Sequence, residues 1–369
     1  MKTVEGKYTS AMIFTDSVED YALAQLQMIC DNAAFEGSKI RIMPDVHPGK
    51  VGPIGFTATV TERVMPAIVG IDVGCGMTMA KIKAKRLEGQ QLDKVIRERV
   101  PSGSAIRKNP HRYAMEFDIA RLNCAEHLRL DKAARSLGTL GGGNHFIEVD
   151  RDDEGSLYVI IHSGSRHLGK EVAEYYMNEG YKAPKQKGEA VPYELTYLEG
   201  EMMRRYMQDV AYVQEYAALN RAAMMDEILQ GMKWKSVEMY SCIHNYIDVQ
   251  QDASIIRKGA ISAMAGERVI IPINMRDGVI LGTGKGNEEW NCSAPHGSGR
   301  IMKREDAKNR HTLTEFKQAM KGVYTTCVSR ETLDEAPFAY RGMEEIVANV
   351  AETIEIDKIL KPVYNYKAG

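Results

Sequence analysis

The amino-acid sequence of 369 residues predicts an α+β fold, in which one large domain of interwoven β-sheets is flanked by helices. Two observations lead to this prediction. Short apolar runs bounded by glycine, which are typical of buried strands, recur along the chain, whereas long helical patterns are few. The apolar runs cover 40–43, 51–60, 67–73, 78–82, 145–149, 157–162, 267–273 and 278–282. Because neither a repeat nor a linker-like segment interrupts them, we expect residues 1–369 to form a single domain, although the length alone would allow two.

The clearest helical pattern covers residues 197–230, where apolar side chains recur every three or four positions. Gly231 follows as the expected end of this helix. A second helix is expected over residues 343–360, just before Pro362. Residues 182–188, with one proline and three lysines, are expected to form an exposed loop.

The composition is that of a globular chain, with 44% hydrophobic and 27% charged residues. The formal net charge of -2 argues against nucleic-acid binding through overall basicity, but it is compatible with a local basic groove. The amino-terminal segment lacks a secretory pattern, and no apolar stretch approaches the roughly 18 residues of a membrane span. Six cysteines without a Cys-x-x-Cys pair indicate free thiols in a reducing compartment. We therefore expect a cytoplasmic protein with no membrane partner.

Glycines concentrate beside histidines and one cysteine in five segments. These segments are GIDVGCGM at 70–77, LGGGNHF at 140–146, IHSGSRHLG at 161–169, GTGKGN at 282–287 and APHGSGR at 294–300. Glycine lets the backbone approach a ligand closely and adopts turn conformations that other residues avoid. Tight turns would explain any one of these segments but explain all five poorly, so the pattern indicates a site of chemistry.

Two histidines frame a predicted β-hairpin. His145 begins the run NHFIEV and His162 ends the run LYVIIH, with RDDEGS between them. A turn symmetric about Asp153 and Glu154 would make the two histidines direct cross-strand neighbours, with Cβ atoms ~4.5–5.5 Å apart. Such a separation suits two ligands of one metal centre.

Further candidate ligands lie in other segments. Asp72 and Cys75 follow an apolar run, and the glycines on both sides of Cys75 leave its sulfur accessible. His244 supplies a third imidazole, and Asn245 beside it can orient a ligand or substrate. One carboxylate, one thiolate and three imidazoles suffice for a binuclear metal site, in which the thiolate can bridge two ions. These donors suggest Zn²⁺ by their softness and also admit Mn²⁺, Fe²⁺ or Co²⁺.

A second candidate centre surrounds His296. This histidine follows Pro295 and precedes two glycines, which leave its ring accessible to act as a nucleophile. Arg300 can hold phosphate oxygens with its guanidinium group. A purely structural loop histidine is equally compatible with this segment. The nearby GTGKGN is not a Walker A sequence and is weak evidence by itself.

Together these segments resemble the RtcB family of GTP-dependent RNA ligases. The matching segments follow the family's order and cover most of the chain. They are MPDVHPGKVGPIG at 43–55, GIDVGCGM at 70–77, LGTLGGGNHFIEV at 137–149, HSGSRHLG at 162–169, AALNR at 217–221, HNY at 244–246, RKGA at 257–260, SAPHGSGR at 293–300, DEAPFAY at 334–340 and Lys367.

The resemblance implies an RtcB-like fold, two bound Mn²⁺ ions and GTP. The implied metal ligands are Asp72, Cys75, His145, His162 and His244, with Cys75 as the bridge. His296 would attack the α-phosphate of GTP and release pyrophosphate. The GMP would pass to an RNA 3′-phosphate, and a 5′-hydroxyl would displace it to form a 3′,5′-phosphodiester. A 2′,3′-cyclic phosphate would first be opened by hydrolysis, so the implied role is RNA repair or tRNA splicing.

The resemblance also implies a guanine-nucleotide pocket. Its residues would be Asn144, Phe146, Glu148, Asn245, Lys285, Arg300, Tyr340 and Lys367. Glu148 would accept hydrogen bonds from guanine and Lys367 would donate to its O6, whereas adenine has the opposite polarity. The chain departs from the family at 278–286, where GVILGTGKG replaces a serine-containing segment and Lys285 would replace the serine contacts. His167 stands where the family usually has glycine and would crowd or tune the metal site.

Three other functions stay open on the sequence alone. A binuclear metal-dependent phosphodiesterase would need the five ligands but neither His296 nor Lys367. A capping enzyme would leave GMP on nucleic-acid 3′ ends, and an idle RNA-binding relative would be expected to have lost a ligand or the nucleophile. Retention of SAPHGSGR favours the ligase. The expected partners are GTP and RNA with a 3′-phosphate or 2′,3′-cyclic phosphate and a 5′-hydroxyl, and the expected state is a monomer.

Overall fold

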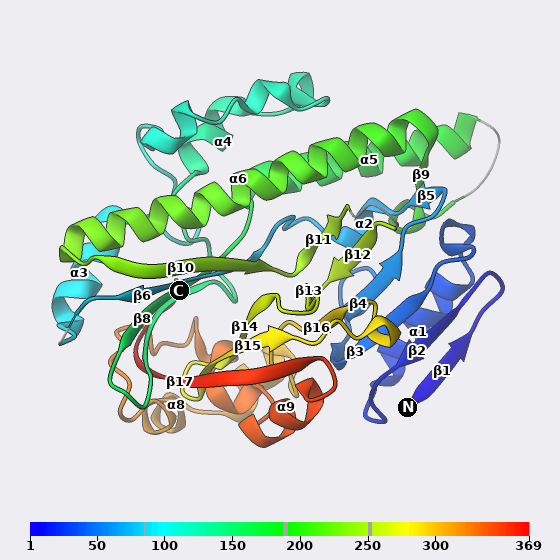
Figure 1. Cartoon of the computed structure of the whole chain (residues 1–369). Helices are drawn as coiled ribbons and strands as arrows, with labels where there is room; N and C mark the ends of the chain where they lie inside the picture. The colour runs from blue at the N-terminus through cyan, green and yellow to red at the C-terminus, as the bar shows by residue number, and fades with distance from the viewer. Residues whose placement is uncertain (85, 187–190, 250–252, 369) are drawn as a thin grey trace.

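The computed structural model describes residues 1–84, 86–186, 191–249 and 253–368, with the backbone alone for 183–186. Figure 1 shows helices packed around two large sheets. The strands are β1 (Lys2–Glu5), β2 (Ser10–Ile13), β3 (Ile40–His47), β4 (Ile54–Thr59), β5 (Arg63–Val64), β6 (Gly76–Ile82), β7 (Phe146–Arg151), β8 (Leu157–Ser163), β9 (Leu198–Glu199), β10 (Ser236–Ile243), β11 (Asn245–Asp248), β12 (Ile255–Lys258), β13 (Ala260–Ser262), β14 (Arg268–Asn274), β15 (Gly278–Gly284), β16 (Ser293–Pro295) and β17 (Ile354–Tyr366). The α-helices are α1 (Asp20–Cys30), α2 (Pro66–Val69), α3 (Gly89–Arg99), α4 (Leu130–Ser136), α5 (Arg166–Gln186), α6 (Gly200–Met232), α7 (Arg304–Arg310), α8 (Leu313–Ala319) and α9 (Met343–Val350). The 3-10 helices are η1 (Ala33–Phe35), η2 (Arg112–Met115), η3 (Ile119–Arg121), η4 (Ala125–His127), η5 (Tyr193–Leu195), η6 (Glu288–Trp290), η7 (Leu333–Glu335) and η8 (Pro337–Ala339).

The strands form two large sheets and two small ones. The six-stranded sheet has the order β1-β2-β3-β4-β12-β11, and the seven-stranded sheet has the order β10-β6-β8-β7-β17-β15-β14. Within the described residues, β2 and β3 pair in parallel and the other strand pairs are antiparallel. Helices and mainly antiparallel sheets in one chain confirm the predicted α+β class. The single-domain assignment stays a prediction.

Helix α6 connects the two sheets, as its long path across Figure 1 shows. It contacts β6 and β8 of the seven-stranded sheet and β11 of the six-stranded sheet. One apolar core lies between the six-stranded sheet and helices α1, α5 and α6. A second core lies between the seven-stranded sheet, α3 and the C-terminal half of α6. Among the helices of the described chain, none combines the length and the apolar character that a membrane crossing requires.

Four candidate ligands lie at the ends of four adjacent strands of the seven-stranded sheet. Strands β10, β6, β8 and β7 are neighbours in this order. Cys75 comes just before β6, His162 is near the end of β8, and His145 comes just before β7. His244 is the only residue between β10 and β11, where the chain passes from one large sheet to the other. The fold therefore brings these ligands to the junction of the two sheets.

Most predicted strands are confirmed, but the strand over 67–73 is wrong. Residues 66–69 form the short helix α2, with Pro66 at its first position, and a turn follows. Proline is well tolerated there because the first turn of a helix needs no N–H bond from it. The four residues of this helix are buried, so their apolar run carries no periodicity that separates a helix from a strand.

The predicted helices need three corrections. The C-terminal helix ends at Val350 instead of continuing to residue 360, because Ile354 starts strand β17. The long helix is confirmed, but it begins at Gly200 instead of residue 197, because residues 198–199 form β9. It also ends two residues later than predicted, where Lys233 adopts a left-handed conformation with φ 55°. Residues 182–186 of the predicted loop belong to α5, and 187–188 lie outside the described residues.

The hairpin β7–β8 is confirmed, but its predicted register is wrong by one residue. His162 pairs with Phe146, and His145 lies just outside the ladder. The five residues 152–156 connect the strands, with Asp152 and Ser156 joined by a backbone hydrogen bond of 3.1 Å. An odd loop length centres the turn on one residue, Glu154, and this shifts every cross-strand partner by one position.

Candidate metal and nucleotide site

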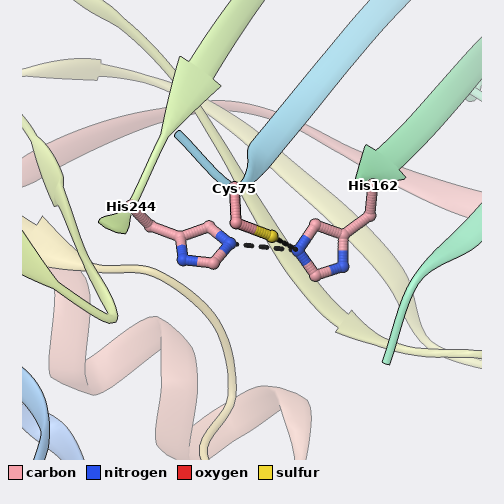
Figure 2. A group of neighbouring side chains, drawn as sticks. All are labelled: Cys75, His162 and His244. Atoms are coloured by element: carbon pink, nitrogen blue, oxygen red, sulfur yellow. Dashed lines mark hydrogen bonds between the residues drawn. The ribbon is translucent and has the colours of Figure 1, made fainter. Parts of the chain in front are cut away.

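A cluster of one thiol, one carboxylate and three imidazoles lies at the junction of the sheets. The Cys75 Sγ atom is 3.4 Å from Nε2 of His145 and 3.4 Å from Nε2 of His162. Nε2 of His162 is 3.0 Å from Nε2 of His244, and Nε2 of His145 is 3.0 Å from a carboxylate oxygen of Asp72. Figure 2 shows Cys75, His162 and His244 directed toward one another. The structure thus brings together all five residues that the sequence suggested as metal ligands.

The five side chains form two groups that share the thiol. Cys75, His162 and His244 form one group, and Asp72, Cys75 and His145 form the other, with the ligand atoms of each group within 4.8 Å of one another. Nitrogen, sulfur and oxygen atoms converging in this way fit divalent transition metals. Cys75 can contribute to both groups because a thiolate sulfur can bridge two ions.

Hydrogen bonds to the backbone orient two of the imidazoles. Nδ1 of His145 donates to the carbonyl of Leu140 at 2.9 Å, and Nδ1 of His162 donates to the carbonyl of Asn144 at 3.1 Å. Each bond leaves the Nε2 lone pair directed at the cluster, which is the arrangement that metal-binding histidines commonly have. Burial also lowers the pKa of His162 well below its usual value, so this ring is neutral and can donate its lone pair.

Helix α6 holds the segments that carry the ligands through two buried side chains. The Arg221 guanidinium donates to the carbonyls of Gly74 at 2.8 Å and Ser163 at 2.9 Å. The Asn220 amide donates to the carbonyl of Gly164 at 2.9 Å. Both side chains are fully buried. Both residues belong to the segment AALNR, but their roles could not be predicted from the sequence because their partners lie far away along the chain.

Two adjacent glycines allow a direct test of this geometry. A Cβ on Gly141, whose φ is +89°, would lie 2.1 Å from the Arg166 guanidinium and 2.6 Å from Nδ1 of His145, whereas a Cβ on Gly142 would meet nothing closer than 3.7 Å. Gly141→Ala is therefore expected to displace His145, to lower metal affinity at least about tenfold and to cost about 1–3 kcal/mol of unfolding free energy. Gly142→Ala is the matched control, and both can be compared by metal titration and thermal melting. Equal metal affinity in the two variants would contradict the role of His145.

A hydrogen-bonded pair of side chains, His296 and Asp45, lies next to the cluster. Nδ1 of His296 is 2.8 Å from a carboxylate oxygen of Asp45, whose side chain is only 2% exposed. The His296 ring centroid is 4.9 Å from that of His244. Asp45 lies on β3 and His296 follows β16, and a gap of 251 positions kept this pair from being recognised in the sequence.

A cavity joins His296 to most of the predicted nucleotide residues. The predicted residues that line it are Asn144, Phe146, Glu148, His162, His244, His296, Arg300, Tyr340 and Lys367. Its walls also include His47 and Glu335, which the sequence analysis did not assign. His47 lies on β3 two residues after Asp45, and Glu335 lies in the segment DEAPFAY.

The buried carboxylate of Glu335 organises the cationic wall of this cavity. It accepts hydrogen bonds from the Tyr340 hydroxyl at 2.5 Å and the Lys367 ammonium at 3.2 Å, and it pairs with Arg304. Burial alone would raise the pKa of Glu335, but the charges of Lys367 and Arg304 lower it to about 2. Arg300 contacts the ring of Tyr340 and donates to its hydroxyl at 3.0 Å. The ionised carboxylate of Glu335 therefore holds the side chains of this wall in place.

Three predicted residues do not line the cavity. Lys285 is exposed, and its ammonium donates to the carbonyl of Ala351. Asn245 does not line the cavity, but its side chain accepts a hydrogen bond from the backbone N–H of Gly259 at 2.9 Å and donates to the carbonyl of Asp72 at 3.5 Å. The His167 ring pairs with Glu171 at 2.7 Å on α5 instead of facing the thiol cluster. The structure thus gives Lys285 and His167 partners outside the site, whereas Asn245 contacts the backbone of a candidate metal ligand.

Comparisons with known proteins agree with this arrangement. The family model described as tRNA-splicing ligase RtcB matches residues 29–129 and 116–368. The RNA-splicing ligase RtcB of Escherichia coli (strain K12) is 33% identical in an alignment that covers 95% of each chain. The tRNA-splicing ligase RtcB of Aeropyrum pernix is 26% identical and aligns with 86% of this chain and 85% of its own length. Because these matches extend over nearly the whole chain, the protein belongs to the RtcB family of RNA ligases.

Proposed function

We propose that this RNA ligase joins an RNA 3′-phosphate or 2′,3′-cyclic phosphate to a 5′-hydroxyl with GTP as the energy source and two Mn²⁺ ions. The observation that carries the proposal is that His296 and the ligand cluster face one cavity, which both His296 and His244 line. A phosphate bound there lies within reach of a nucleophile and of metal ligands. The names of its relatives refer to tRNA and RNA splicing, so cleaved tRNA is the first substrate to test.

Two overlapping ligand groups support a binuclear site. Asp72, Cys75 and His145 would hold one ion, and Cys75, His162 and His244 would hold the other. The mixture of a carboxylate, imidazoles and a thiol is compatible with Mn²⁺. When bound, the two cations would neutralise the negative charge of the phosphates and make phosphorus easier to attack.

His296 is the proposed nucleophile. The Asp45 carboxylate accepts a hydrogen bond from Nδ1–H of His296, which leaves the lone pair of Nε2 free to attack. A bond forms between Nε2 and the α-phosphorus of GTP, and pyrophosphate leaves. An oxygen of the RNA 3′-phosphate then attacks the same phosphorus, and the imidazole is released. Finally the 5′-hydroxyl attacks the RNA phosphorus and GMP leaves, which forms the new phosphodiester.

Glu148 and Lys367 are proposed to select guanine. Both line the cavity, and the Asn365 amide fixes the Glu148 carboxylate by donating to it at 2.5 Å. An ionised carboxylate accepts hydrogen bonds from N1–H and the amino group of guanine, and an ammonium donates to O6. Adenine presents an acceptor at N1 and a donor at the 6-position, so it would meet repulsion at both points.

The guanine contact is expected to depend on pH. Burial raises the pKa of Glu148 to about 7, although hydrogen bonds with Asp150 and Asn365 and the charge of Lys367 act in the opposite direction. The acceptor form is therefore lost as pH falls through 7, and between pH 8 and pH 6 its population falls about tenfold. We expect the affinity for guanosine, which has no titrating phosphate, to fall by a similar factor. Glu148→Gln should bind guanosine weakly at both pH values, and an unchanged pH dependence in this variant would assign the titration to another group.

The proposed reaction is tested with α-labelled GTP, Mn²⁺ and two short RNAs that carry a 3′-phosphate and a 5′-hydroxyl. We expect a covalent label on the protein after denaturing electrophoresis and a joined RNA product when both RNAs are present. Opening of a cyclic phosphate without any label on the protein would instead support a metal-dependent phosphodiesterase. Transfer of label to RNA 3′ ends without joining would support a capping enzyme.

A further inference from the structure

A second hollow lies beside the C-terminal end of α3 and the C-terminal half of α6, which Figure 1 shows next to each other. It is an open groove of about 1000 Å³. Residues 97–102 and 105–112 form one side of it, and three side chains of α6 together with Tyr366 complete it. The groove shares no lining residue with the cavity of His296, so it is a separate surface.

Positive charge concentrates in this groove. Its cationic side chains are Arg97, Arg99, Arg107, Lys108 and Arg112. Its carboxylates are Glu98, Asp226 and Glu227. Cations therefore outnumber carboxylates here, although the whole chain has a formal net charge of -2. A cationic surface on a chain that is otherwise slightly acidic fits a polyanionic partner.

The two carboxylates of α6 are already neutralised by neighbouring arginines. Glu227 lies 3.4 Å from the Arg107 guanidinium and 3.6 Å from that of Arg99, so two cations share one anion. Asp226 pairs with Nη2 of Arg112 at 2.6 Å, so the other guanidinium N–H groups of Arg112 can still bind a phosphate. Lys108 and Arg112 are both exposed at the rim, where a phosphate can reach them without prior opening of the fold. Arg97 pairs with Asp93 at 2.7 Å, so the excess positive charge of the groove lies on Lys108 and on Arg99 and Arg107, which share one carboxylate.

The groove meets the cavity along two backbone segments. Tyr366 lines the groove, and the next residue, Lys367, lines the cavity. On the other side, the N–H of Gly103 donates to the carbonyl of Gly141 at 2.9 Å, and the carbonyl of Gly103 accepts from Arg166 at 3.0 Å. The loop that borders the groove is thus fastened to the segment that ends in His145. The groove and the cavity therefore approach each other at the C-terminal end of β17.

We propose that this groove binds the sugar–phosphate backbone of the RNA strand whose reactive end occupies the cavity. The inference rests on the proposed function, because it assigns to the groove the strand that the ligase acts on. Lys108 and Arg112 contact phosphates, so binding is independent of base sequence and weakens with salt. For single strands the logarithm of affinity falls with the logarithm of salt concentration by ~0.7 for each neutralised phosphate.

The test uses the full chain loaded with Mn²⁺, without GTP, and a 12-nucleotide single-stranded RNA with a 3′-phosphate. The variant K108E/R112E is compared with K317E/K321E, which makes the same charge change at exposed lysines that line neither hollow. We expect K108E/R112E to bind RNA at least about fivefold more weakly at 0.1 M salt, with a salt slope smaller by about 1.4. K317E/K321E should bind as the unchanged protein does. Equal losses in both variants, or no loss in K108E/R112E, would overturn the proposal.

Two further measurements separate this proposal from the proposed function and from misfolding. Labelling by α-labelled GTP in the absence of RNA should proceed equally in K108E/R112E and in the unchanged protein. RNA binding that depends on the groove in a protein that GTP does not label would support the groove and refute the nucleotide chemistry. In the unchanged protein, 4-thiouridine RNA should cross-link on irradiation to peptides from residues 97–112, and cross-links confined to other peptides would refute the groove.

Discussion

Replacing His296 with alanine is expected to abolish the covalent labelling of the protein by GTP, with a rate loss on the order of 10⁴ or more. Alanine offers no atom that can form the bond to phosphorus. Nδ1 of His296 is held by Asp45, so Nε2 is the atom whose loss matters. The rate is measured in a single turnover with α-labelled GTP. A variant that still accepts label would place the nucleophile elsewhere, and His47 in the same cavity would be the next residue to test.

The variant His296→Ala is also expected to separate the opening of a cyclic phosphate from ligation. Opening of a 2′,3′-cyclic phosphate needs no nucleotidyl intermediate, so it is expected to persist in His296→Ala while ligation is lost. In Asp45→Asn the rate of covalent labelling by GTP should fall by a factor on the order of 10² or more. The amide can donate to Nδ1 and so favour the wrong tautomer of His296. Equal loss of ring opening and ligation in His296→Ala would contradict this division.

Replacing Cys75 with alanine is expected to affect both reactions. Its sulfur belongs to both ligand groups, so its loss weakens both metal positions at once. Labelling by GTP and opening of a cyclic phosphate should each fall by a factor on the order of 10³ or more, because both depend on the charge of the metal ions. Metal content after dialysis gives an independent readout and should fall below one ion per chain.

Cys124→Ala serves as the matched control for Cys75→Ala. Both sulfurs are buried, but Cys124 lies in the core beside helix α6, where Asp209 accepts a hydrogen bond from its backbone N–H at 3.2 Å. Cys124→Ala is expected to cost some stability without changing metal content or labelling. A Cys75→Ala protein that retains two metal ions would show that the thiol is not a shared ligand.

The sequence predicted local structure well where the periodicity was unambiguous. The 3.6-residue pattern predicted helix α6, and two apolar runs separated by the turn-like segment RDDEGS predicted the hairpin β7–β8. The prediction failed at β17 because the helical pattern of residues 343–350 runs into a segment whose first isoleucines, Ile354 and Ile356, alternate as in a strand. A break of only three residues, 351–353, separates the two patterns, and tertiary pairing with β7 and β15 decides the outcome.

The ligand cluster was easier to predict than its supports. Cysteine and histidines beside glycines are distinctive residue types, and His145 and His162 come together even though their predicted register was wrong by one residue. Asp45 and Arg221 have no such signal, since a carboxylate in a strand or an arginine in a helix is usually solvated. Their roles follow only from partners that folding brings close, and no local pattern encodes those contacts.

Strand β17 also determines when the protein can fold. It lies between β7 and β15 in the seven-stranded sheet, and Tyr366 pairs with Ile147 while Leu360 pairs with Val279. A nascent chain that has not yet released residues 354–366 would expose the unpaired edges of both neighbours, and such edges promote aggregation. Pairing across so many intervening residues also predicts slow folding. We therefore expect chaperones to raise the yield of folded protein during synthesis, even if the completed protein is stable.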